Sequence, residues 1–344
     1  MANAQQQEDA EPATVVVWTD DARSALVQQV LDLMGSAVSP IGVGGPRGTA
    51  VEALADTLDC TLEDDFRQLM VERRVSCVLL ATMTGATASD ALLWASAGVA
   101  VLALEPICAT LEELADATAA VIGRQAITAS GPVALAPGFE HCPGWTGAAD
   151  PTQVLNSPQL IGFTTTGPAT SASLFARLYS AWRVVLTIGV DLPASIDASL
   201  IGPAGSLPDD LRGVSGSLAA HARAGRGERE WSAVVEVGDQ IGPGFRQLRL
   251  IGAAGRLLVH DHGYELYDQQ GKPLDAQPAA VQSATDADLI AEHWRRRLDQ
   301  SSPRPATSIP DDAAVLACCL ACLLSARTGQ PESPAKLLQV QGRR

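Results

Sequence analysis

Lysine is nearly missing from this sequence. Only two of the 24 basic residues are lysines, Lys272 and Lys336, and the others are arginines. The first 271 residues therefore contain no ammonium side chain. This excludes any reaction that needs a lysine in that part of the chain.

Other absences exclude whole classes of protein. No apolar stretch reaches the roughly 20 residues of a membrane-spanning helix. The polar, acidic start at residues 1–13 lacks the pattern of a secretion signal, so we expect a disordered arm and a cytoplasmic protein. Seven cysteines, an odd number, do not indicate a disulfide framework. The formal net charge of −15 argues against nucleic acid and anionic membranes as partners.

The pattern that is present indicates two domains. Over residues 14–130, continuous apolar runs such as Val15–Trp18 alternate with amphipathic segments, which is typical of a parallel sheet covered on both faces. We predict a Rossmann-like, doubly wound domain there. Thr110 and Glu113 have the spacing of a capping box and predict the start of a helix.

The second half follows a Gly/Pro-rich crossing that begins at residue 131. Strands then succeed one another mostly without helices, which predicts an α+β domain with one large, mainly antiparallel open sheet over residues 131–330. Residues 331–344 are expected to be a tail. Helices are expected at Ser173–Ile188, Asp286–Leu298 and Asp311–Ala326.

Three stretches carry a resemblance to a known family. Asp65–Leu69 with Val75–Thr82 is similar to a helix and a strand ending in Ala-Thr, and Leu104–Glu113 is similar to a Glu-Lys-Pro segment with its capped helix. Leu248–Leu257 is similar to a strand, a glycine-containing turn and a strand. In this order and spacing they resemble the Gfo/Idh/MocA oxidoreductases over nearly the whole chain. The resemblance implies a nicotinamide cofactor cleft, whose positions here are Thr19, Asp20, Arg47, Thr82, Thr84, Glu105 and Pro106.

The glycines that hold a dinucleotide are absent after the first predicted strand. A GxGxxG motif there lets the backbone approach the pyrophosphate at a helix N-terminus, but this strand runs into Trp18-Thr19-Asp20-Asp21 without a glycine. We expect Asp20 and Asp21 to occupy the positive end of the following helix, with Asp20 as an ordinary N-cap rather than a ligand.

A second glycine-rich stretch, Gly42–Gly48, follows the next predicted strand. In the family this place discriminates the cofactor ribose, and Arg47 could meet a 2′-phosphate. No acidic ribose partner is present, and isolated glycine clusters usually mark turns. We therefore favour a flexible loop with a solvated arginine.

The catalytic positions that the resemblance identifies are altered. Aligned on Pro106, the lysine of Glu-Lys-Pro is Glu105, and a carboxylate can accept a proton but cannot stabilise an alkoxide. The family's aspartate and histidine, four residues apart on one helical face, correspond to Ala176 and Ser180. No catalytic residue is predicted. Three polar residues of that helix remain candidates for an anionic ligand, with simple solvation as the favoured alternative: Arg177, Tyr179 and Arg183.

Two other groups of reactive side chains give little support for a site. His260 and His262 face the same side of a predicted strand, but Zn²⁺ needs further ligands, so no metal is predicted. Cys319 and Cys322 lie in an Ala/Leu-rich helix, and we assign them to packing rather than redox chemistry.

We therefore predict an oxidoreductase-like protein that has lost NAD(P) binding and hydride transfer, and that acts as a ligand-binding, scaffolding or regulatory protein. The expected partners are a small carbohydrate-like ligand and a second copy, or a family relative, on the exposed face of the second sheet. The alternative is an active NAD(P)-dependent dehydrogenase of a sugar or cyclitol, with Glu105 and tyrosine or arginine side chains replacing the usual groups. A structural module without a small ligand is a third possibility.

Overall fold

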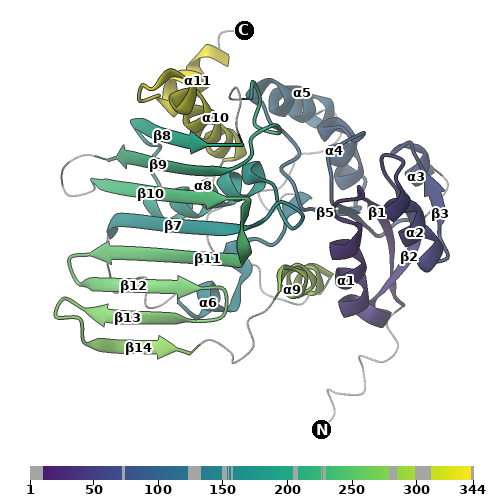
Figure 1. The fold of residues 1–344 in the computed structure, drawn as a ribbon, viewed down its shortest axis with the longest axis horizontal. Helices are drawn as coiled ribbons and strands as arrows, with labels where there is room; N and C mark the ends of the chain where they lie inside the picture. Colours follow the sequence, from purple (N-terminus) through teal and green to yellow (C-terminus); the bar gives the residue numbers. More distant parts are fainter. Residues whose placement is uncertain are drawn as a thin grey trace.

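The computed structural model has two domains, each built on one β-sheet (Figure 1). The six-stranded sheet belongs to the N-terminal half and the eight-stranded sheet to the C-terminal half. The structure describes residues 11–71, 74–122, 133–148, 153, 155, 158–203, 208–225, 227, 230–278, 285–298 and 311–341.

The first sheet is parallel, with the strand order β3-β2-β1-β4-β5-β6. Its central strands are mostly apolar and buried, because helices cover both faces. This confirms the predicted doubly wound sheet. The strands are β1 (Ala13–Trp18), β2 (Val38–Gly44), β3 (Thr61–Glu63), β4 (Cys77–Leu80), β5 (Ala100–Ala103) and β6 (Val133–Leu135).

The last helix of this domain begins with a side-chain cap. Thr110 accepts the Glu113 N–H at 3.0 Å, and the Glu113 carboxylate accepts the Ala109 N–H at 2.8 Å, so the predicted capping box is present with the carboxylate one residue further back than expected. The elements are α1 (Ser24–Met34), the 3₁₀ turn η1 (Gly35–Ala37), α2 (Thr49–Thr57), α3 (Gln68–Val71), α4 (Ala88–Ser96) and α5 (Leu111–Ile122).

The second sheet has the order β14-β13-β12-β11-β7-β10-β9-β8. All neighbours are antiparallel except β7 and β10, which run parallel in its centre. The mainly antiparallel open sheet is thus confirmed. Its strands are β7 (Pro158–Pro168), β8 (Ser195–Ile201), β9 (Ser217–Ala224), β10 (Trp231–Gly238), β11 (Gln240–Gly252), β12 (Gly255–His260), β13 (Tyr264–Asp268) and β14 (Pro273–Gln277).

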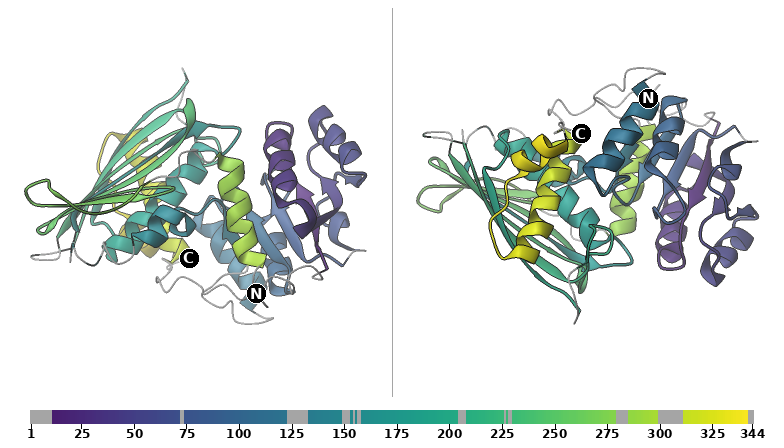
Figure 2. Two further views of the ribbon diagram at one scale, coloured as in Figure 1. Left: turned by 90° about the horizontal axis from the view of Figure 1, so that it is seen from below. Right: turned by 90° about the horizontal axis from the view of Figure 1, so that it is seen from above.

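Two helices, α8 (Leu174–Gly189) and α10 (Asp312–Thr328), pack against one face of this sheet, and Figure 2 shows the opposite face bare of helices in the part of the chain described. Alternate residues along the strands are buried under these helices.

Cys319 and Cys322 are fully buried in α10, and the Trp182 indole donates to the Cys322 sulfur at 3.3 Å. Both cysteines therefore pack in the core, as expected. A last helix, α11 (Pro334–Gln341), lies within the predicted tail.

The chain crosses between the domains more than once. Strand β6 extends the first sheet beyond residue 130, and the turn η2 (Phe139–His141) and helix α6 (Pro143–Gly147) follow it. Helix α9 (Asp286–Leu298) then returns from the second sheet and packs against α1 (Figure 1). Its buried face joins the core of the first domain, where Trp294 is 0% exposed. In the part of the chain that the structure describes, no helix combines the length and the hydrophobicity of a membrane span.

We expect Trp294→Ala to lower the free energy of unfolding by about 3–5 kcal/mol, because it empties a fully buried site where α9 meets the first domain. Urea unfolding measures the change. Glu292→Ala, on an exposed part of the same helix, is the control and should cost less than about 1 kcal/mol. Equal effects of the two variants would contradict this packing.

Candidate functional site

The site lies where the strand order of the first sheet reverses, between β1 and β4. In open α/β sheets, ligands bind in the crevice beyond the carboxyl ends of strands at this point. Here the segments that follow β1, β4 and β5 meet the N-terminus of α8 from the second domain. The predicted cleft positions Thr19, Thr82 and Glu105 are brought together in this region and are all buried.

Glu105 is the centre of a buried polar network in this crevice. It follows β5 and is 8% exposed. Its carboxylate pairs with the guanidinium of Arg23, whose side chain is 11% exposed, and accepts the hydroxyl of Ser173 and the Ser173 N–H at 3.1 Å. Arg23 also pairs with Asp20 at 3.3 Å. Because both charges are buried, each neutralises the other, and neither is available to a ligand without breaking the pair.

A second bridge closes the crevice between β1 and β4. The Trp18 side chain is fully buried, and its indole N–H donates to the Thr84 carbonyl at 2.9 Å. The Thr82 hydroxyl bonds that of Thr84 at 3.3 Å. Trp18 thus occupies, with a large side chain, the end of the strand where dinucleotide-binding proteins have glycine.

Two amides at the start of α1 are already bonded. The N–H groups of Arg23 and Ser24 donate to the Asp20 carbonyl at 3.2 and 3.0 Å, and the Arg23 N–H also reaches the Asp20 carboxylate at 3.1 Å. These are two of the donors that would face a phosphate at a helix N-terminus. The structure assigns the N-cap to Arg23, so Asp20 caps the preceding turn rather than the helix itself.

The expectation that Asp21 also occupies the start of α1 is wrong. Its carboxylate accepts the N–H groups of Ala50 and Val51 at 2.9 and 3.1 Å, so it caps α2 instead. The reason is local geometry, because Gly48 has no side chain and lets the Asp21 carboxylate lie against the α2 N-terminus, where an added Cβ would come within 2.3 Å of it.

The glycine-rich stretch after β2 serves chain packing. A side chain at Gly45 would lie 1.8 Å from the Thr19 carbonyl, and one at Gly44 would lie 2.8 Å from the Trp18 ring. Arg47 is 79% exposed in its side chain and pairs with Asp64 at 2.8 Å on the surface. The structure therefore does not direct Arg47 into the crevice.

The helix α8 presents its polar residues in two directions. Ala176 and Ser180 line a small cavity of about 30 Å³ beside the crevice, together with Arg177, Arg246 and Asp286. Arg177 donates to the carbonyls of Thr166 and Pro168 and to the Ser171 hydroxyl, at 2.9–3.2 Å. Burial lowers the pKa of Arg177. This arginine holds the end of β7 and is not solvated.

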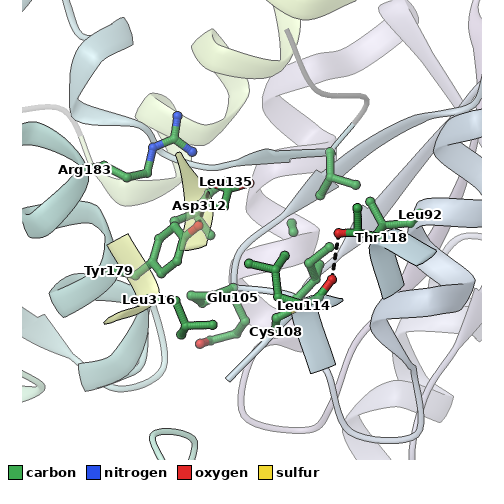
Figure 3. Close-up of a pocket in the computed structure, with 14 residues that line it drawn as sticks. Leu92, Glu105, Cys108, Leu114, Thr118, Leu135, Tyr179, Arg183, Asp312 and Leu316 are labelled. Atoms are coloured by element: carbon green, nitrogen blue, oxygen red, sulfur yellow. Dashed lines mark hydrogen bonds between the residues drawn. The ribbon is translucent and has the colours of Figure 1, made fainter. Parts of the chain in front are cut away.

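Tyr179 and Arg183 line a different cavity (Figure 3). The Tyr179 hydroxyl donates to Asp312 at 2.7 Å, and Arg183 pairs with Glu140 at 2.9 Å. Burial raises the pKa of Glu140, but the charges of Arg183, His141 and Arg246, together with a backbone hydrogen bond, more than offset it, so the net shift is downward. The three polar candidates of α8 are therefore not assembled into one anion site.

No group of three or more histidine, cysteine, aspartate or glutamate residues that could hold a metal ion occurs among the described residues. His260 ends β12, and its N–H donates to the Gly263 carbonyl at 2.9 Å. This hydrogen bond closes the turn between β12 and β13, as in a hairpin.

Comparison with known proteins rests on structure. Neither a protein-family model nor a curated protein matches the sequence. An oxidoreductase from Agrobacterium radiobacter, in complex with NAD⁺, L-tartaric acid and magnesium, matches with a TM-score of 0.67 and 12% identity over 95% of this chain and 100% of that chain. A UDP-N-acetylglucosamine 3-dehydrogenase from Acidithiobacillus ferrooxidans matches with a TM-score of 0.65 and 15% identity over 94% of this chain and 98% of that chain. A myo-inositol dehydrogenase from Corynebacterium glutamicum matches with a TM-score of 0.61 and 13% identity over 94% and 98% of the two chains. The chain has the Gfo/Idh/MocA oxidoreductase fold.

Within the Gfo/Idh/MocA fold, several site residues were not predicted from the sequence. Arg23, Ser173 and Trp18 form the closed crevice, and Arg246 and Asp312 line the two cavities. A sequence signal existed for Ser173, which begins the helix and caps it by accepting the Ala176 N–H at 3.0 Å. No sequence signal identified Arg23, because its partner Glu105 is 82 residues away along the chain.

A double-mutant cycle should show strong coupling between Arg23 and Glu105. Arg23→Met leaves a buried carboxylate without its cation and should lower the free energy of unfolding by about 3–5 kcal/mol, whereas Arg23→Met with Glu105→Leu should be much less destabilised than the sum of the single variants. The exposed pair Arg47 and Asp64 is the matched control, with coupling below about 1 kcal/mol. Coupling as weak as the control's would mean that the Glu105 pair does not hold the crevice closed.

Proposed function

We propose that this chain is an oxidoreductase-like protein that has lost NAD(P) binding and hydride transfer, and that it acts as a ligand-binding, scaffolding or regulatory protein. The observation that carries the proposal is the buried pair of Arg23 and Glu105, joined to Ser173, in the crevice where the fold binds its cofactor. A dinucleotide would have to displace this pair and separate Trp18 from Thr84.

The residues of this crevice do not fit a nicotinamide dinucleotide. The diphosphate would meet the carboxylates of Asp20 and Glu105, and the amides of Arg23 and Ser24 are already bonded to Asp20. The family's lysine position is a carboxylate, and no lysine precedes Lys272. We therefore derive no hydride-transfer step for this chain.

The second candidate is an active NAD(P)-dependent dehydrogenase of a sugar or cyclitol. It is favoured by the fold itself, since one structural neighbour is described in complex with NAD⁺ and L-tartaric acid. It requires Arg23 to swing out of the crevice and Glu105 to act as a base, with an arginine or tyrosine in place of the lysine. Opening the crevice in this way would leave the Glu105 carboxylate or the Arg23 guanidinium without its partner, which lowers the stability of the protein.

For partners, we propose a small carbohydrate-like ligand and a second copy or family relative at the bare face of the large sheet. This face carries exposed side chains of both charges, among them His221, Arg223, Glu236 and Arg249. Opposite charges on one flat surface allow two copies to face each other in complementary register. All seven cysteines are free, which suits a reducing compartment such as the cytoplasm.

Titration with NAD⁺, NADH, NADP⁺ and NADPH, followed by calorimetry, tests the loss of cofactor binding. We expect no heat of binding with any of the four at submillimolar concentration, because the crevice is filled by its own side chains. Binding of any one at that concentration would favour the active dehydrogenase. Glu105→Lys is the companion variant and should show no turnover, because it restores the ammonium but not the glycine loop.

Sedimentation equilibrium tests the sheet-face partner. We expect a mass that is a multiple of the monomer and that falls to one monomer in Val234→Asp, which places a charge in the middle of β10 on the bare face. Leu33→Asp, at an exposed residue of α1 in the other domain, is the control and should leave the mass unchanged. A monomeric wild-type chain would count against this partner.

A further inference from the structure

A cavity of about 130 Å³ lies between the two domains (Figure 3). Its walls come from α4, α5, β5 and β6 of the first domain and from α8 and α10 of the second. Most of the side chains around it are apolar, including Leu92, Leu114, Leu135 and Leu316. Glu105 also borders it, but its carboxylate is already bound by Arg23 and Ser173.

One end of the cavity is polar. The Tyr179 hydroxyl donates to one oxygen of Asp312 at 2.7 Å. Burial, together with the Asp312 charge, raises the pKa of Tyr179 well above its usual value, so the hydroxyl stays protonated. Among the described residues, no ion pair joins Asp312 to a cation. Asp312 is an exposed residue that also lines the cavity, so its remaining lone pairs can accept hydrogen bonds from water or from a ligand.

The rest of the lining is neutral or already bonded. Burial raises the pKa of the Cys108 thiol to about 12, so it forms part of an uncharged wall. The Thr118 hydroxyl donates to the Leu114 carbonyl at 2.7 Å. Arg183 borders the same polar end and pairs with Glu140. The Arg183 charge also attracts Asp312. An ammonium group beside Asp312 would therefore have to share this carboxylate with the guanidinium.

The size and lining select the ligand. An engineered apolar cavity of about 150 Å³ binds benzene, so this cavity accommodates one six-membered ring. A sugar would bury several hydroxyl groups against leucine side chains without partners, which is unfavourable. A single hydroxyl on an apolar ring matches the two acceptors at one end and the leucines elsewhere.

We propose that this cavity binds a small neutral alcohol or phenol the size of a benzene ring, with the ring between Leu92, Leu114 and Leu135 and the hydroxyl donating to Asp312. The cavity adjoins the cofactor crevice at Glu105, whose carboxylate faces Arg23 and Ser173. A ligand held there contacts both domains, so it stabilises their packing.

Methyl NMR with phenol, toluene and benzylamine tests the proposal on the full chain. We expect phenol to shift the methyl resonances of Leu114 and Leu316 and to bind more tightly than toluene or the benzylamine cation. Asp312→Ala should weaken phenol binding about tenfold and leave toluene binding unchanged, because only phenol donates to the carboxylate. Asp312→Asn, which keeps an acceptor, should lie between the two.

Variants that place a larger side chain in the cavity test whether phenol and toluene bind there and not elsewhere. Leu114→Phe, or Ile107→Phe if the first variant does not fold, should abolish binding of both phenol and toluene. Ser180→Ala, on the same helix as Tyr179 but lining the smaller cavity, is the control and should leave both unchanged. Absence of phenol-induced shifts, tighter binding of benzylamine than of phenol, or an equal loss of phenol and toluene in Asp312→Ala would overturn the proposal. A parallel NAD⁺ titration reports on the crevice alone, so the two proposals fail independently.

Discussion

The Glu105 carboxylate joins three parts of the molecule that are distant in sequence. It follows β5, and its partners are Arg23 before α1 and Ser173 before α8 of the second domain. A buried carboxylate is tolerated only with a cation and hydrogen-bond donors around it. This requirement brings the Arg23 side chain into the crevice and ties the second domain to the edge of the first sheet. The crevice beyond the carboxyl ends of β1 and β5 is consequently occupied by these side chains.

The fold depends on the apolar core and not on the residues of the crevice. The parallel strands of the first sheet and the helices α8 and α10 on the second are stabilised by buried apolar side chains away from the crevice. Replacing glycine by Trp18 and Asp20, or lysine by Glu105, alters the site while the core stays apolar. A fold can therefore be shared at 12–15% identity with solved oxidoreductases, because the fold depends on the core and not on the residues of the crevice.

The sequence was sufficient to predict both sheets, because apolar runs with helical spacers and strands without spacers have distinct patterns. It also predicted the capped helix at Thr110 and the burial of Cys319 and Cys322. The sequence did not predict contacts between residues that are distant along the chain. The pairing of Arg23 with Glu105 spans 82 residues, and Asp21 caps a helix that begins 28 residues later in the chain, where local rules assigned it to the nearest helix. Helix α9 has an amphipathic pattern that predicts a helix but not the domain against which it packs.

The most direct test is a crystal structure of the protein grown with a large excess of NAD⁺. We expect no dinucleotide density beyond the end of β1, with Arg23 bonded to Glu105 and the Trp18 indole bonded to Thr84. Density for a nicotinamide dinucleotide in the crevice, with Arg23 displaced from Glu105, would contradict the closed crevice.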